Sequence, residues 1–182
     1  MDPDTNTFVN CETELFSVNT KKIEDTADFI CRSLGFENWE LSISFVESEE
    51  IRRLNQEFRN IDKSTDVLSF PQQEWDEPLT LEHPFNKPKT KTPIPFMLGD
   101  LVISLDDAQA NAKDIGHELD RETGFLLVHG ILHLCGHDHM EPEEEELMTD
   151  QQRKLMEKMT SEFNTPIWKL GVVPVASARS PQ

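Results

Sequence analysis

Cysteine is scarce in this sequence, and its pattern excludes a protein held together by disulfide bonds. Only three cysteines, Cys11, Cys31 and Cys135, occur among 182 residues. An odd number without paired spacing does not form a disulfide framework, and it favours a reducing compartment. A chain of this length can also bury a sizeable core without such cross-links.

Long hydrophobic runs are missing as well, so we expect no association with a membrane. No apolar stretch approaches the ~20 residues that a membrane helix requires. The first residues lack a basic region followed by an apolar run, and their acidic character argues against an organelle transit peptide. Together with the cysteine pattern, these observations predict a cytoplasmic protein.

Acidic side chains outnumber basic side chains by about two to one. The chain has 17 lysines and arginines against 35 aspartates and glutamates, and its formal net charge is −18. Because phosphate neutralisation needs clustered lysine and arginine, this balance argues against a general nucleic-acid coat protein. Much of the acidic excess lies in the N-terminal "MDPDTNTFVNCETE" and in "MEPEEEELMTD", which leaves room for a local basic or metal-centred patch elsewhere.

Hydrophobic periodicity predicts alternating helices and strands. Apolar residues at helical spacing indicate five helices, and shorter apolar or alternating runs indicate three strands, with a further short strand at "TFVN". The expected helices cover residues 19–34, 48–58, 106–116, 119–136 and about 142–163, and the expected strands cover 39–46, 65–71 and 98–105. This order is typical of an α+β fold in which about five helices pack on a small mixed β-sheet.

Residues 1–165 are predicted to form this single domain, and residues 166–182 a flexible C-terminal tail. Prolines and lysines are frequent in residues 72–97, which we interpret as a long irregular loop that is either functional or mobile. The helix over 119–136 is apolar nearly all round from Phe125 to Leu134, which is typical of a buried helix at the centre of a domain.

This central helix carries histidines at the spacing of a metal site. The stretch "VHGILHLCGHDH" places His129 and His133 one turn apart on one helical face, where two imidazoles can reach one ion. Gly136 can adopt a left-handed conformation that ends the helix and turns the chain back, so that His139 becomes a third ligand. Three protein ligands with an open position are the arrangement of a catalytic zinc. We therefore predict one Zn²⁺, although nickel, copper or manganese would suit the same ligands.

Three neighbours of the motif are weaker candidates for the site. We interpret His137 as a residue at the rim of the site and Cys135 as a core residue rather than a thiolate ligand. Asp138 either orients a ligand or faces water.

Gly130 bears on the reaction that the site can perform. In zinc peptidases with this histidine spacing, a glutamate follows the first histidine and takes the proton of the attacking water, whereas this chain has Gly130 there. Amide hydrolysis is therefore poorly supported. Phosphodiester cleavage remains credible, because a metal ion and an arginine can share the developing charge. The glycine either lets a bulky substrate approach the helix or serves the packing of the helix.

The same residues carry a resemblance to a known family. "HGILHLCGHDH" resembles the H-G-x-L-H-L-x-G-[YH]-D-H signature of the YbeY proteins, and "LNQEFRNIDKSTDVLSFP" and "LGDLVISL" agree with two further segments of that family in the same order. The resemblance extends from about Trp39 to Phe163. The chain differs in a longer stretch between Pro71 and Gly99, in an extended tail, and in His137, where many members have tyrosine.

The resemblance implies an activity and the residues that perform it. YbeY proteins are single-domain α+β metalloproteins that act as endoribonucleases in rRNA maturation, especially at the 3′ end of the small-subunit rRNA, and in ribosome quality control. Their zinc ligands correspond to the three histidines above. Their functionally important arginine corresponds to Arg59, which we expect to contact phosphate. The alternative for Arg59 is a salt bridge with Asp62 or Asp66.

Three functional hypotheses follow. The first is a zinc-dependent endoribonuclease that prefers single-stranded RNA, cuts an rRNA precursor, and works with the ribosomal small subunit or assembly factors; no DNA substrate is expected. The second is a ribosome assembly factor that binds RNA and whose zinc is mainly structural. The third, a metallopeptidase, conflicts with Gly130.

Several aromatic and basic residues are candidates for contacts with RNA. Because the chain has no tyrosine, stacking of bases would fall to phenylalanine or tryptophan, for example Phe70, Trp75 or Phe96. The helix periodicity places Phe58 on the inward face of its helix. A basic rim around the metal is expected from Arg52, Arg53, Arg59, Lys63 and the lysines of "NKPKTK".

Overall fold

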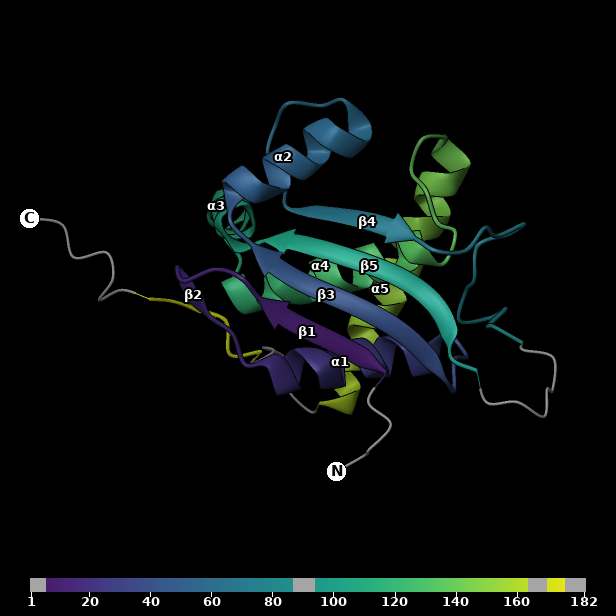
Figure 1. Cartoon of the computed structure of the whole chain (residues 1–182). Helices are drawn as coiled ribbons and strands as arrows, with labels where there is room; N and C mark the ends of the chain where they lie inside the picture. The colour runs from purple at the N-terminus through teal and green to yellow at the C-terminus, as the bar shows by residue number, and fades with distance from the viewer. Residues whose placement is uncertain (1–5, 87–93, 164–169, 176–182) are drawn as a thin grey trace, which may run out of the picture.

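A mixed four-stranded sheet with helices on both faces organises the chain (Figure 1). The computed structural model describes residues 6–86, 94–163 and 170–175. In chain order the elements are β1 (Thr7–Cys11), β2 (Phe16–Ser17), α1 (Thr20–Ser33), β3 (Trp39–Val46), α2 (Ser48–Arg59), β4 (Val67–Pro71), β5 (Phe96–Ser104), α3 (Leu105–Ile115), α4 (Leu119–Leu134), α5 (Pro142–Glu162) and β6 (Val173–Pro174). The predicted α+β fold class is confirmed.

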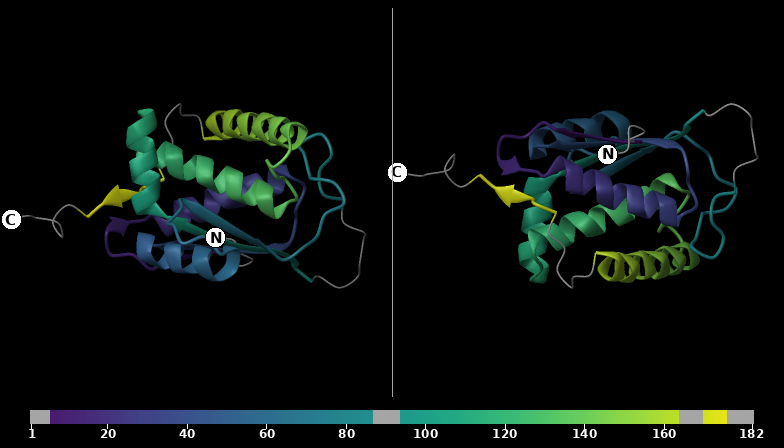
Figure 2. Two further views of the ribbon diagram at one scale, coloured as in Figure 1. Left: turned by 90° about the horizontal axis from the view of Figure 1, so that it is seen from above. Right: turned by 90° about the horizontal axis from the view of Figure 1, so that it is seen from below.

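The strand order of the main sheet is β1-β3-β5-β4, with β1, β3 and β5 parallel and β4 antiparallel to β5. Alternation along β3 sends Leu41, Ile43 and Phe45, each fully buried, into the main core. The two views of Figure 2 show that the sheet separates α2 from α1, α4 and α5. On the α2 side a smaller cluster joins Ile51 to apolar side chains of β3, β4 and β5.

α4 is the central helix, as its apolar sequence predicts. It contacts α1, α3 and α5 as well as β4 and β5, and Leu127, Val128 and Ile131 are fully buried. The metal motif therefore lies on a buried helix between the sheet and α5. Within the described ranges, none of the helices combines the length and the apolar character that crossing a membrane demands.

The long loop and the tail differ in part from expectation. β5 begins at Phe96, two residues before the predicted strand, and the described loop residues 72–86 and 94–95 contain neither helix nor strand; residues 87–93 lie outside the described part. In the predicted flexible tail, Leu170 and Val172 are buried, and Val173–Pro174 pairs antiparallel with β2. This segment is packed because its apolar side chains join the core. Residues 166–169 and 176–182 are not described.

Candidate metal centre

Three histidine side chains converge at the C-terminal end of α4. His129 and His133 lie on the helix, and His139 follows the turn at Gly136, whose φ of 97° is the left-handed conformation that the sequence predicts. A ring nitrogen of each histidine lies within 4.8 Å of those of the other two. The structure therefore brings together the three histidines that their spacing selects.

Hydrogen bonds determine the tautomer of two of these imidazoles. Nδ1 of His129 lies 2.6 Å from Oε1 of Gln152 on α5, and Nδ1 of His133 lies 2.9 Å from the backbone oxygen of His137. Because both partners are oxygen acceptors, each Nδ1 donates its hydrogen and each Nε2 keeps a lone pair. Sequence reasoning missed Gln152, since a contact between residues of two helices that are 23 positions apart in the chain leaves no local signal.

The two Nε2 atoms, of His129 and His133, face each other at 3.1 Å. Two lone pairs at this distance repel unless a cation lies between them. Zn–N bonds of 2.0–2.1 Å at a tetrahedral angle would place two nitrogens about 3.3 Å apart. The residues present therefore fit a shared zinc ion.

Burial keeps these imidazoles in the neutral form that a metal requires. It lowers the pKa of His133 to about 4, and the neighbouring His129 adds to this shift. Burial also lowers the pKa of His129, against the hydrogen bond with Gln152, which raises it. Since metal ligation needs unprotonated imidazole, both side chains are ready to bind an ion at neutral pH.

The loop after β4 is docked on the end of α4. The Trp75 indole donates to the Leu134 carbonyl at 2.7 Å, and the Leu79 backbone N–H donates to the Cys135 carbonyl at 3.1 Å. These bonds satisfy carbonyls that the end of a helix leaves free. Trp75 also packs on Gly136, where an added Cβ would lie 2.8 Å from the Trp75 Cβ. The loop thus supports the turn that delivers the third histidine.

His137 is not at the rim of the site, as the sequence suggested, but inside the protein. It is 3% exposed, and its Nε2 donates to the Leu79 carbonyl, because the turn directs its side chain toward the docked loop. Cys135 is buried, and burial raises the pKa of its thiol, so it packs in the core as predicted. Asp138 accepts a hydrogen bond from the His139 backbone N–H at 2.7 Å and so shapes the turn.

Gly130 faces the sheet. A Cβ added there would lie 2.7 Å from Cδ2 of Leu101 on β5, and the Gly130 carbonyl accepts a hydrogen bond from Ser69 at 3.4 Å. Close packing of α4 on the sheet therefore accounts for the glycine, rather than the approach of a substrate. The Cβ of a glutamate at this position would clash with the buried Leu101 side chain. The site therefore has no room for the glutamate that a peptidase of this class uses as its base.

Arg59 is the last residue of α2, and its exposed guanidinium has no ion pair or hydrogen bond to the residues that the structure describes. Both alternative partners are occupied. Asp62 accepts two hydrogen bonds from Arg52, at 2.8 and 3.1 Å. Asp66 accepts one from Asn111 at 2.9 Å and one from Thr65 at 3.4 Å. Arg59 is therefore available to an anion from outside the chain.

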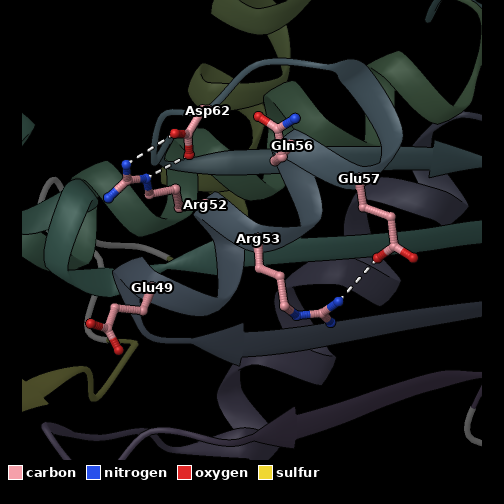
Figure 3. Close-up of a pocket in the computed structure, with 6 residues that line it drawn as sticks. All are labelled: Glu49, Arg52, Arg53, Gln56, Glu57 and Asp62. Carbon is pink, nitrogen blue, oxygen red and sulfur yellow. Dashed lines mark hydrogen bonds and ion pairs between the residues drawn. The ribbon is translucent and has the colours of Figure 1, made fainter.

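Arg52 and Arg53 do not form part of the predicted basic rim. Figure 3 shows them on the outward face of α2, next to carboxylates. Arg53 pairs with Glu50 at 2.9 Å and with Glu57 at 3.0 Å, and Arg52 pairs with Asp62. These contacts neutralise their charge locally. The lysines of "NKPKTK" lie at residues 87–91, outside the described part of the chain.

The exposed aromatic side chain near this arginine is Phe58. It is 60% exposed, not inward as the periodicity predicts, and its ring meets Phe70 edge-on with centroids 5.3 Å apart. Phe70 is half-buried beneath it. Trp75 and Phe96 pack in an aromatic cluster around Phe36. Among the aromatic candidates, Phe58 therefore offers the freest ring to a base.

The sequence is similar to bacterial endoribonucleases. A family model described as "Endoribonuclease YbeY" matches residues 8–160. The Endoribonuclease YbeY of Limosilactobacillus reuteri is 41% identical over 153 residues, which cover 82% of this chain and 93% of the relative. That of Caldanaerobacter subterraneus subsp. tengcongensis is 46% identical over 120 residues, covering 66% and 73%.

The fold is similar to a solved structure, "Solution structure of TM1509 from Thermotoga maritima". The TM-score is 0.58 with 24% sequence identity, and the match covers 87% of this chain and 91% of that chain. At this identity the similarity concerns the fold alone.

Proposed function

Because the chain belongs to the YbeY endoribonuclease family, we propose that it cleaves RNA internally, with His129, His133 and His139 holding one zinc ion at the reaction centre. The observation that carries this proposal is the pair of Nε2 lone pairs facing each other at 3.1 Å beside the third imidazole. Three protein ligands leave a position open, as in catalytic zinc sites. Bound zinc would polarise a phosphoryl oxygen and activate water for attack.

Arg59 is proposed to bind the phosphate that is cut. Its guanidinium has no partner among the described residues, and its planar fork of N–H donors matches two phosphate oxygens. A fixed cation at this place would stabilise the negative charge that develops as the phosphodiester is attacked. In Figure 1, the end of α2 and the segment joining α4 to α5 lie on the same, upper side of β4.

The substrate is proposed to be single-stranded. Proteins read single-stranded RNA by stacking its splayed bases on aromatic side chains, whereas paired bases are already stacked in a helix. Phe58 presents an exposed ring, braced by Phe70, one residue before Arg59. A base stacked on Phe58 would therefore carry its phosphate toward Arg59.

The RNA is proposed to be an rRNA precursor, cut near the 3′ end of the small-subunit rRNA in the cytoplasm. This proposal rests on the resemblance to YbeY proteins and not on the geometry. A net charge of −18 opposes general association with RNA. The ribosomal small subunit or an assembly factor would then supply part of the affinity.

A ribosome assembly factor with a structural zinc is not favoured. Structural zinc sites are almost always closed by four protein ligands. Within the part of the chain that the structure describes, the ligand group contains three histidines and no fourth side chain.

The test compares the wild-type protein with His133→Ala and with His83→Ala, which changes an exposed histidine outside the centre. Zinc content and cleavage of matched single-stranded and duplex RNA are measured on each preparation. We expect one zinc ion and cleavage of single-stranded RNA in the wild type and in His83→Ala, and loss of both in His133→Ala. Equal trace cleavage in all three preparations would indicate a contaminating nuclease and overturn the proposal.

A further inference from the structure

A groove of about 500 Å³ lies where the end of α3 meets α4 and α5. Figure 2 shows these three helices side by side, with α3 and α5 flanking α4. The apolar lining of the groove includes Ile115, Phe125 and Met156. This volume falls within the range of small-molecule sites, roughly 300–1,000 Å³, and an apolar lining suits a flat ring.

An acidic residue with little exposed surface lines the same groove. Glu122, in the first turn of α4, is 5% exposed, and its carboxylate has no hydrogen-bond donor among the described residues. The helix dipole favours an acidic residue in this turn, and the Glu122 oxygens are not among the buried unpartnered atoms of the described residues, so they reach the groove. Burial, and then the like charge of Asp66, raise the pKa of this carboxyl. The carboxylate is therefore short of donors that a ligand can supply.

An arginine beside Glu122 brings positive charge to the groove. Arg121 lines the groove, is exposed, and makes no ion pair within the described residues, whereas Arg153 is held by Asp150 and Glu157. A ligand in the groove would thus meet the Arg121 guanidinium and the Glu122 carboxylate, neither of which has a side-chain partner in the described part of the chain. That combination suits a molecule that carries both N–H donors and a phosphate.

The groove adjoins His129 of the metal centre through two of its lining residues. Gln152 lines the groove and binds Nδ1 of His129 at 2.6 Å. Phe125 also lines the groove, and the centroid of its ring is 5.8 Å from that of His129. A nucleotide in the groove would therefore lie next to His129, one of the three histidines of the metal centre.

We propose that this groove binds a guanine of the RNA substrate next to the bond that is cut, with Glu122 accepting the guanine N1–H and N2–H and Arg121 meeting its phosphate. The inference rests on the proposed function, because the groove becomes a substrate site only if RNA is cut at the adjoining centre. Of the four bases, guanine alone presents two adjacent N–H donors that a carboxylate can accept in parallel. Single-stranded RNA exposes this edge.

The test measures equilibrium binding of the four nucleoside 5′-monophosphates to the full chain. GMP is expected to bind at least about tenfold more tightly than AMP, CMP or UMP, as one charge-assisted hydrogen bond predicts. Inosine 5′-monophosphate keeps N1–H but lacks the N2 amine, so we expect it to bind about tenfold more weakly than GMP. This comparison uses only the wild-type protein, so a variant that fails to fold does not affect it.

Variants then assign the contacts. Glu122→Gln is expected to lower GMP affinity about tenfold and to remove the preference for cleavage beside guanine, with zinc content unchanged. Glu118→Gln, which removes the same charge from an exposed residue just before α4, serves as the control. Arg121→Ala is expected to weaken all four nucleotides alike.

The outcomes separate this inference from the proposed function. RNA cleavage without any preference for GMP, or with the same preference in Glu122→Gln, would overturn the guanine site and leave the endoribonuclease intact. Glu122-dependent binding of GMP by a protein that does not cleave RNA would refute the proposed function, and the groove would then be a nucleotide site with another role.

Discussion

Oε1 of Gln152 on α5 accepts a hydrogen bond from Nδ1 of His129 on α4, at a distance of 2.6 Å. The bond orients the imidazole so that its Nε2 lone pair faces that of His133. A partner of this kind determines which nitrogen of a histidine can bind a metal and raises its basicity. α5 therefore contributes to the metal centre although no residue of this helix belongs to the three-histidine group.

Gln152→Leu is expected to lower zinc affinity about 10–100-fold, because the His129 ring loses the acceptor that orients it. The stability of the metal-free protein should change little, since Gln152 is only half-buried. Zinc affinity is measured by competition with a chelator, with Gln56→Leu on the exposed face of α2 as the control. An affinity equal to that of the wild type would show that Gln152 does not position the ring.

Arg59→Glu is expected to abolish RNA cleavage without unfolding the protein, because the side chain is exposed and unpaired within the described structure. Arg59→Ala should weaken RNA binding about tenfold or more, as loss of a charge-assisted contact predicts. It should also reduce the salt dependence of binding by about one phosphate contact. RNA affinity is measured over a range of salt concentrations.

Arg53→Ala is the matched control on the same helix, because Arg53 is already paired with Glu50 and Glu57. We expect its RNA affinity to stay near the wild-type value. If both alanine variants lose affinity equally, the effect is one of overall charge and Arg59 has no specific phosphate contact.

Acidification is expected to destabilise the zinc-free protein between about pH 6.5 and pH 4. The folded pKa of His133 is about 4 against an ordinary value of 6.5, and that of His129 is also lowered. As the pH falls through this window, the unfolded chain takes up protons before the folded chain does. The stabilisation is therefore complete above pH 6.5 and is lost toward pH 4. Zinc should be released in the same direction, since its ligands must be neutral.

Urea unfolding at several pH values measures this effect, with His133→Phe for comparison. The raised pKa of Glu122 acts in the opposite direction, so the difference between the two proteins isolates His133. An identical pH dependence of unfolding in both proteins would contradict the assignment.

Gly130→Ala is expected to destabilise the protein by about 1–2 kcal/mol. The new Cβ would meet Leu101 at 2.7 Å, and such overpacking costs about 1–3 kcal/mol, offset by up to ~1 kcal/mol from the better helix propensity of alanine. Adding Leu101→Val removes the contacted methyl group and should restore part of the loss. A simple stabilisation by Gly130→Ala, measured by urea unfolding, would show that the contact is not tight.

The sequence by itself determined the features that depend on local geometry. Two histidines four residues apart share one face of any α-helix, and Gly136 can take the left-handed conformation that returns the chain to His139. The apolar run around them predicted a central helix, because such a surface must be covered on all sides. The metal-ligand candidates and the fold class follow from these short-range rules.

Only the tertiary structure decided which distant groups complete the site. There His129 bonds to Gln152, the His137 side chain turns inward to the Leu79 carbonyl, and Asp62 pairs with Arg52, so that Arg59 has no ion pair among the described residues. These contacts join elements that are far apart in the chain or compete for one partner. Periodicity describes one helix at a time, so the partner of each polar side chain is settled only when α5 and the long loop pack against α4.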